Sequence, residues 1–216
     1  MGNLQKVGII DYGTGNIASI FKAINSIGAE PHLVSNKNQI NNFKCFILPG
    51  VGHFGEAIKY LNENDLHEMI SYILKLKVPI LGICLGFQLL TESSEESLNY
   101  KGLGLFPFKT KRIKIKDTRI FKVPHLGWNS ITRYDEDIKL LKGIKVEKQL
   151  FYYSNAYAIK YKKNTEIRKA FYKHENDLVA IAEYQNLFGV QFHPEKSRNQ
   201  GLMLLKNFLD ISDIRR

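Results

Sequence analysis

Residues 78–90 read VPILGICLGFQLL, an apolar run interrupted by the short segment GICLG at residues 82–86. The part before Cys84 has the length and composition of a buried strand, and an apolar helix pattern follows it. Small residues two positions either side of Cys84 allow a sharp strand-to-helix turn, which in hydrolases holds a nucleophile at the top of a sheet. The segment therefore predicts a strand, a tight turn and a helix, with Cys84 as a candidate nucleophile.

Cys84 is open to two interpretations. At the N-terminus of a helix, unpaired N–H groups and the helix dipole would favour its thiolate. Free cysteines are also among the most buried residue types, so a packing role beside two glycines is an equal alternative. The other cysteine, Cys45, falls inside an expected strand and is interpreted as a core residue. Without a C-x-x-C pair, the two cysteines predict neither a disulfide framework nor a zinc or redox site.

The first half of the chain alternates between strand and helix patterns. The expected strands are residues 4–10, 32–35, 44–48 and 78–83, and the expected helices are residues 17–28, 54–61 and 66–76. Repeated β-α-β order predicts an α/β fold with a mostly parallel central sheet and helices on both faces.

After Glu96 the pattern changes to short segments typical of antiparallel strands. We expect strands at residues 112–115, 120–123, 128–132 and 150–159, a hairpin of 178–183 with 188–192, and a last helix at 201–209. The chain has 216 residues and no long Pro, Ser or Gly-rich linker, so a single domain over residues 1–216 is expected.

The formal charge is +10, with 31 Lys and Arg against 21 Asp and Glu. Such a balance can indicate nucleic acid, an anionic substrate or an acidic partner protein. The segment KTKRIKIK at residues 109–116 is more simply the solvated face of a strand, and no aromatic stacking pattern accompanies it. No apolar run reaches the ~18 residues of a membrane span. We therefore expect a soluble, cytoplasmic protein that binds neither nucleic acid nor membrane.

Two glycine-rich loops follow expected strands. The loop PGVGHFG at residues 49–55 lies at the carboxyl end of its strand, where open α/β sheets bind ligands. Residues 13–18, GTGNIA, match the dinucleotide fingerprint G-x-G-x-x-A. The next strand, however, ends at Asn36 rather than at the acidic residue that would hold a ribose. No cofactor is therefore predicted.

His193 and Glu195 form a second candidate set, directly after an expected strand. A cysteine nucleophile needs an imidazole to move its proton, and the imidazole needs a group that fixes its tautomer. Side chains two residues apart on a strand end point the same way, and Pro194 stiffens the link. A Cys, His and Glu set could also ligate a metal, but it is a weak zinc signature without a cysteine pair or clustered histidines. No metal site is predicted.

Together, five segments make the chain similar to the class I, or triad, glutamine amidotransferases. They are IDYGTGN at residues 10–16, LPGVG at 48–52, GICLGFQLL at 82–90, KVPHLGWN at 122–129 and GVQFHPEKS at 189–197. The cysteine elbow and the His-Pro-Glu segment would match any member of the class. The first and fourth segments and the Lys196-Ser197 extension resemble the histidine-pathway subfamily, the glutaminase subunits of imidazole glycerol phosphate synthase. The resemblance covers nearly the whole chain and implies a flavodoxin-like α/β fold.

The resemblance implies an activity and roles for particular residues. Cys84 would attack the side-chain amide of glutamine, His193 would protonate the departing ammonia, and Glu195 would orient His193. The remaining roles are an oxyanion hole formed by Leu85 with Gly50, Val51 or Gly52, and a substrate-binding role for Gln88. The ammonia would pass to a synthase partner, for this family a (β/α)₈ barrel that forms a heterodimer with the glutaminase. The expected partner surface contains Asp11, Asn16, His125, Trp128, Asn129 and Lys196.

The chain departs from the subfamily at one place. Where the family usually reads Tyr-Phe-Val-His-Ser-Tyr, this chain has Asn155 and Ala156 in place of the His-Ser pair. The glutaminase chemistry is unaffected, but the partner and pathway are left open. A paralogue that supplies ammonia to an N-acetyl-sugar amidotransferase is the alternative enzyme, and a basic nucleic-acid or protein-binding module with a structural cysteine is the alternative of another class.

Overall fold

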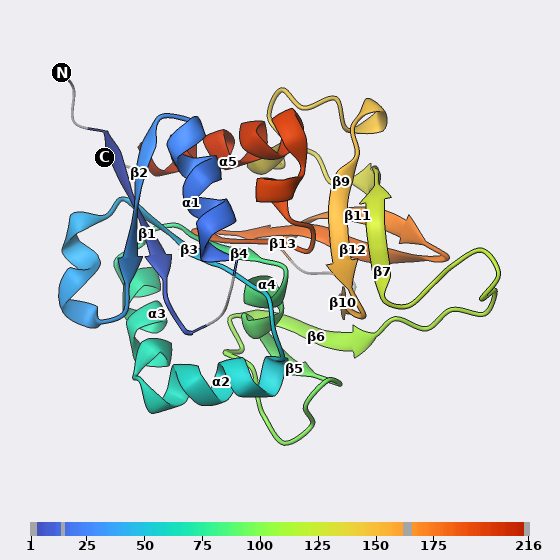
Figure 1. Cartoon of the computed structure of the whole chain (residues 1–216), viewed down its shortest axis with the longest axis horizontal. Helices are drawn as coiled ribbons and strands as arrows, with labels where there is room; N and C mark the ends of the chain where they lie inside the picture. Colours follow the sequence, from blue (N-terminus) through green and yellow to red (C-terminus); the bar gives the residue numbers. More distant parts are fainter. Residues whose placement is uncertain (1–3, 14–15, 162–165, 214–216) are drawn as a thin grey trace.

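A mixed eight-stranded sheet forms the centre of the computed structural model, which describes residues 4–13, 16–161 and 166–213 (Figure 1). In spatial order its strands are β2 (Ala29–Val34), β1 (Gln5–Ile10), β3 (Cys45–Leu48), β4 (Ile80–Ile83), β13 (Leu187–Val190), β12 (Asn176–Tyr184), β11 (Arg168–His174) and β8 (Ile131–Tyr134). The strands from β2 to β13 are parallel, and β12, β11 and β8 continue the sheet in antiparallel pairs. The prediction of a mostly parallel sheet with added antiparallel strands is confirmed.

Helices cover both faces of the sheet, as predicted. They are α1 (Ile17–Ser26), α2 (Phe54–Glu63), α3 (Leu66–Lys75), the short α4 (Leu85–Leu89) and α5 (Arg198–Asp213). The apolar stripes of α1 and α5 join one core cluster with one set of strand side chains, and those of α2, α3 and α4 join the other. In Figure 1, α1 and α5 lie above the sheet and α2 and α3 below it. Buried apolar surface on both faces is what parallel strands require.

Two smaller sheets and short 3₁₀ helices complete the described structure. One sheet has the order β10 (Tyr157–Lys160), β6 (Phe106–Arg112) and β5 (Thr91–Ser94), and the other pairs β7 (His125–Asn129) with β9 (Phe151–Asn155). The 3₁₀ helices are η1 (Lys37–Asn42), η2 (Lys139–Leu141), η3 (Val146–Lys148) and η4 (Pro194–Lys196). In the described part of the chain, no helix is long and apolar enough to cross a membrane.

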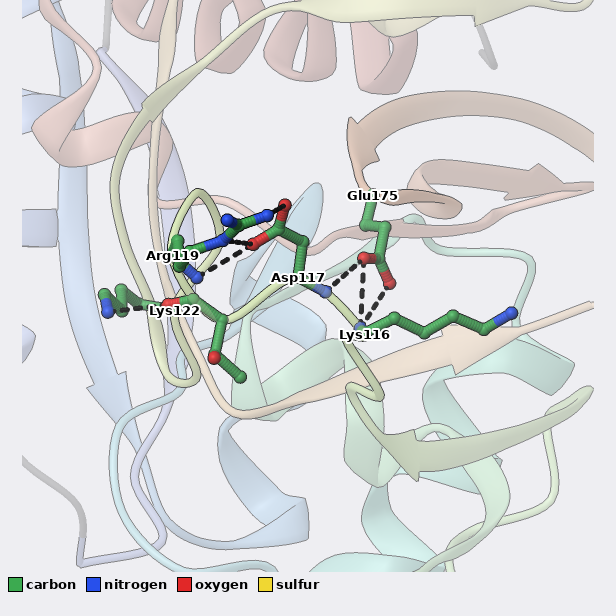
Figure 2. Close-up of polar contacts among 6 residues, drawn as sticks. Lys116, Asp117, Arg119, Lys122 and Glu175 are labelled. Carbon is green, nitrogen blue, oxygen red and sulfur yellow. Dashed lines mark hydrogen bonds and ion pairs between the residues drawn. The ribbon is translucent and has the colours of Figure 1, made fainter.

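The strands expected at residues 112–115 and 120–123 are wrong. β6 ends at Arg112, and the following residues run as a loop to β7. The Glu175 carboxylate, in the β11–β12 turn, accepts hydrogen bonds from the backbone N–H groups of Lys116 and Asp117 at 2.8 and 2.9 Å (Figure 2). A side chain thus satisfies backbone groups that a strand would pair in a ladder. Ile120, expected in a strand, is 72% exposed.

Two further expected strands are each divided between sheets. Residues 150–159 contain β9 and β10, which separate at Ala156, and residues 128–132 contain the end of β7 and the start of β8. The hairpin is confirmed, because Tyr184 of β12 pairs with Leu187 of β13 across a two-residue turn. Three strands were missed: β5, β11 and β6, of which only Arg112 lies in an expected strand.

Candidate active site

Cys84 lies between β4 and α4 in a strained backbone conformation. Its φ and ψ are 50° and −107°, and non-glycine residues with positive φ of this kind concentrate at functional sites. The Cys84 N–H donates to the carbonyl of Val190 at 2.8 Å, and its own carbonyl accepts from the Gln88 N–H at 3.1 Å. These bonds tie the turn to β13 and to α4. The predicted strand, turn and helix are therefore confirmed, with Cys84 6% exposed at their junction.

The turn is closed by contact between two backbones. A Cβ atom added to Gly86 would lie 2.0 Å from the Leu48 carbonyl oxygen, and one added to Gly50 would lie 2.2 Å from the Gly86 nitrogen. Glycine is thus required on both sides of the contact. This backbone contact places the loop at residues 50–52 beside the N-terminus of α4, which begins at Leu85.

His193 and Glu195 follow β13, which is the parallel neighbour of β4. Both chain segments therefore leave the sheet at the same edge. His193 Nδ1 is 2.9 Å from Glu195 Oε1, and the two side chains are 2% and 0% exposed. The His193 N–H donates to the Tyr152 carbonyl at 2.8 Å, and the Ser197 hydroxyl donates to the His193 carbonyl at 2.6 Å. Hydrogen bonds to both the backbone and the side chain of His193 therefore fix the position of its imidazole.

The electrostatics of His193 depend on Cys84 and Glu195. Burial lowers the pKa of His193, but the negative charge of Cys84, hydrogen bonding to Cys84, and the hydrogen bond and charge of Glu195 together raise it to about 10. An imidazolium is therefore stable at neutral pH beside Cys84 and Glu195. The three side chains form the arrangement that a cysteine nucleophile needs.

A cavity of about 200 Å³ opens beside the thiol. The sequence-predicted site residues that line it are Gly50, Val51, Gly52, Cys84, Leu85, Gln88, His193 and Lys196. Gln88 Nε2 donates to the Tyr157 carbonyl at 3.0 Å and to Gln191 Oε1 at 3.2 Å, which fixes its side chain at the cavity wall. No cluster of His, Cys, Asp and Glu suited to a metal ion occurs within the described ranges.

Two residues of this site were missed. Gln191 is fully buried, and its Nε2 donates to Cys84 Sγ at 3.7 Å, so an uncharged donor faces the candidate nucleophile. Glu96 lines the cavity, and its carboxylate accepts a hydrogen bond from the Phe54 N–H at 2.9 Å. The segment GVQFHPEKS contains Gln191, but alternation alone would make it a core position. Glu96 lies in an acidic run, TESSEE at residues 91–96, that carries no spacing signal.

The residues predicted for a partner surface lie in different environments. Trp128 is 40% exposed, with the Arg198 guanidinium 4.7 Å from its ring centroid. Asn129 Nδ2 donates to the Lys173 carbonyl at 2.8 Å. His125 is only 7% exposed and stacks on His174 at 4.2 Å, so its side chain does not reach the surface. Burial and the charge of His174 lower the pKa of His125 to about 4, which keeps it neutral.

The loop after β1 is described only in part. Asp11 Oδ1 accepts a hydrogen bond from the Gly13 N–H at 3.1 Å. The next two positions of the predicted segment, Thr14 and Gly15, lie outside the described residues. Asn16 Nδ2 donates to Glu195 Oε1 at 2.6 Å. Asn16, predicted for the partner surface, therefore contacts a residue of the candidate triad.

The chain belongs to the class-I glutamine amidotransferases, because the sequence profile of that family, "Glutamine amidotransferase class-I", matches residues 8–211. It is therefore an enzyme with glutaminase activity, which excludes the basic binding module with a structural cysteine.

Two curated relatives and one solved structure illustrate the membership. The chain is 40% identical to "Imidazole glycerol phosphate synthase subunit HisH" of Bacillus cereus over 94% of this chain and 93% of the relative. It is also 40% identical to the protein of the same name from Caldanaerobacter subterraneus subsp. tengcongensis, over 94% and 96%. The solved structure of PurLQS from Thermotoga maritima shares the fold, with a TM-score of 0.72 at 17% identity over 97% of this chain and 99% of that one.

Proposed function

We propose that this chain is the glutaminase subunit of an imidazole glycerol phosphate synthase. We further propose that Cys84, His193 and Glu195 carry out glutamine hydrolysis. The observation that carries the chemistry is the approach of His193 to both Cys84 and Glu195 beside one cavity. The HisH relatives, at 40% identity over nearly their whole length, support the pathway.

In the proposed reaction the Cys84 thiolate attacks the side-chain amide carbon of glutamine. The carbonyl oxygen becomes negative as the C–S bond forms, and the Leu85 N–H with one N–H from residues 50–52 are the candidate donors to it. His193 gives its proton to the nitrogen as the C–N bond breaks, which releases ammonia and leaves a γ-glutamyl thioester. Water then attacks the thioester, His193 takes up the proton of the water, and glutamate leaves.

Glu96 is the residue that we assign to the α-ammonium group of glutamine. Its carboxylate is a negative group on the cavity wall, and the hydrogen bond from the Phe54 N–H fixes its position. An ion pair at a partly enclosed site would discriminate glutamine from a neutral amide of the same size. Gln88, held by its two hydrogen bonds, provides a polar wall for the amide end of the substrate.

Hydrolysis is expected to fall on the alkaline side as His193 loses its proton. The pKa of His193 is raised to about 10, so the group is protonated at neutral pH and deprotonates as pH rises toward that value. The departing ammonia needs that proton, so kcat should decline over the same range. The measurement is kcat at saturating glutamine between about pH 6 and 11, in the wild type and in Glu195→Gln. The variant should show its decline at lower pH, because the charge of Glu195 helps to raise the pKa of His193. A wild-type decline near the ordinary histidine pKa of about 6.5 would contradict this assignment.

A synthase partner would dock at the sheet edge that carries the cavity. Lys196 is exposed at the cavity, and Trp128 is an exposed aromatic side chain nearby on β7. The loop at residues 113–124 adds exposed Lys114, Lys116 and Lys122, and the Glu175 contacts hold it in shape (Figure 2). A partner with an acidic face would complement this surface and associate faster at low salt.

Lys196→Ala is expected to weaken association with the partner by about 2 kcal/mol or more, because in the proposed interface Lys196 would form a partly desolvated ion pair. The measurement is the Kd of the two proteins at low and high salt. Lys75→Ala is the matched control, since Lys75 ends α3 ahead of β4, at the opposite edge of the sheet. Equal affinity for the wild type and Lys196→Ala would remove Lys196 from the interface.

A second candidate partner is a sugar synthase of the N-acetyl-sugar amidotransferase type. The observation in its favour is that Asn155 and Ala156, which replace the His-Ser pair of the histidine-pathway subfamily, both line the cavity. Asn155 is 6% exposed, and its Nδ2 donates to the Tyr157 carbonyl at 2.9 Å and to the Tyr172 hydroxyl at 3.2 Å. The substitution therefore lies at the site itself.

The partner experiment compares glutaminase rates of the isolated chain with rates of mixtures containing either synthase and its acceptor. The proposal expects slow hydrolysis alone and activation by the cyclase barrel with its acceptor. Activation only by a sugar synthase would select the second candidate. Full activity of the isolated chain, unchanged by either partner, would contradict partner control.

A further inference from the structure

Asn16 occupies the position before α1, where asparagine normally caps a helix. An N-cap side chain usually accepts hydrogen bonds from the first N–H groups of the helix, which stabilises the helix by about 1 kcal/mol. The Asn16 side chain makes no such bond to α1. Its backbone is left-handed, with φ 74° and ψ 7°, a conformation that asparagine tolerates better than most residues. The Asn16 side chain therefore does not cap α1.

The amide of Asn16 is instead bonded to Glu195. Nδ2 donates to Oε1 at 2.6 Å, and the same oxygen lies 2.9 Å from His193 Nδ1. The other oxygen of Glu195, Oε2, is buried and has no hydrogen-bond partner among the described residues. Asn16 and His193 therefore hold this carboxylate through one shared oxygen. A buried carboxylate with so few bonds depends strongly on each of them.

We propose that Asn16 is a positioning residue of the catalytic site, which fixes the orientation of Glu195 and through it that of His193. The inference rests on the function proposed above. It changes the role of the loop after β1, which the sequence placed only at a partner surface. Asn16 does not line the cavity beside Cys84, so it acts on the triad and not on glutamine.

The test compares Asn16→Leu, which keeps the approximate size and removes the donor, with Asn16→Ser, which keeps a shorter donor. Asn25→Leu is the matched control, because Asn25 is an exposed position of α1, the helix that Asn16 precedes. We expect kcat to fall about 10- to 100-fold in Asn16→Leu, the factor for one hydrogen bond to a charged group, with KM nearly unchanged. Asn16→Ser should recover part of the loss, and Asn25→Leu should behave as wild type.

The pH profile separates positioning from a loss of folded protein. Without Asn16, the Glu195 carboxylate can turn away from His193 and supports its imidazolium less, so the alkaline decline of kcat should move to lower pH. A smaller folded fraction would scale the whole profile without moving it. If Asn16→Leu does not fold, as judged by thermal unfolding, Asn16→Ser carries the same comparison.

Alkylation of Cys84 by iodoacetamide gives a readout that does not need glutamine hydrolysis. Cys45 is fully buried and burial raises its pKa to about 12, so it should not react in the folded protein. The alkylation rate should fall in Asn16→Leu and not in Asn25→Leu. A wild type that hydrolyses no glutamine with any partner would refute the proposed function, while the alkylation rates would still test Asn16. The positioning role would be overturned if Asn16→Leu had the kcat, the pH profile and the alkylation rate of the wild type.

Discussion

Cys84→Ala is expected to abolish glutamine hydrolysis by the complex while leaving synthesis from free ammonia intact. The variant loses the sulfur that forms the thioester in the proposed reaction, and neither His193 nor Glu195 would replace it as a nucleophile. Removal of a catalytic nucleophile lowers kcat by at least about 10⁴-fold in well-studied hydrolases. The proposed partner carries out the synthase reaction on its acceptor, and from this chain it needs only ammonia.

Two measurements check this result. Glutamate release is followed with glutamine as substrate, and acceptor turnover is followed with an ammonium salt in its place. Cys45→Ala is the matched control, because Cys45 is buried in β3 and does not line the cavity. It should retain glutamine turnover. Hydrolysis by Cys84→Ala near the wild-type rate would end the nucleophile assignment.

Gly50→Ala is expected to disrupt both the fold and the oxyanion donors. The new Cβ would lie 2.2 Å from the Gly86 nitrogen and 2.3 Å from the Ile83 carbonyl oxygen. These are backbone atoms of the turn that carries Cys84, so the loop and the turn must separate. Overpacking of this kind costs about 1–3 kcal/mol or more, and loss of one oxyanion donor lowers kcat about 10²- to 10³-fold.

Gly28→Ala is the control for Gly50→Ala. Gly28 has φ 81° but no atom within 4 Å of an added Cβ, so its alanine variant carries backbone strain without a clash. It should lose about 1 kcal/mol of stability and keep its activity. The free energy of unfolding and kcat are measured for both variants. Equal stability and activity of Gly50→Ala and the wild type would show that the two backbones do not meet as described.

The first half of the fold followed from its local pattern, because its strands are short and mostly apolar, and β1, β3 and β4 are each followed directly by a helix. The same holds for the turn at Cys84, where two small residues permit a backbone that larger ones would block. The second half was harder to predict. Its strand boundaries depend on partners distant in the sequence, as Ala156 illustrates by separating two strands of different sheets.

The loop at residues 113–124 illustrates a different limit. Alternation of lysine and isoleucine predicted a strand, but the Glu175 carboxylate satisfies backbone N–H groups that a ladder would have paired. A side chain about 60 positions away determines that this segment is a loop, and local strand propensity cannot predict that contact.

The site shows the same division. Cys84, His193 and Glu195 could be proposed because the five segments together resemble a known family, although each residue alone also has an ordinary structural interpretation. Gln191 and the contact of Asn16 with Glu195 could not, since an amide side chain in a core strand or after a glycine-rich loop has many ordinary roles. Only the arrangement in space gives these amides their partners.

The position of β13 beside β4 has a consequence for how the enzyme is made. Gln191, the donor to the Cys84 sulfur, comes 107 positions later in the chain, and His193 follows it. A ribosome makes the cysteine turn long before the strand that completes it. An unfinished chain therefore carries Cys84 without Gln191 and His193, and the proposed triad is incomplete until synthesis of the chain is nearly over.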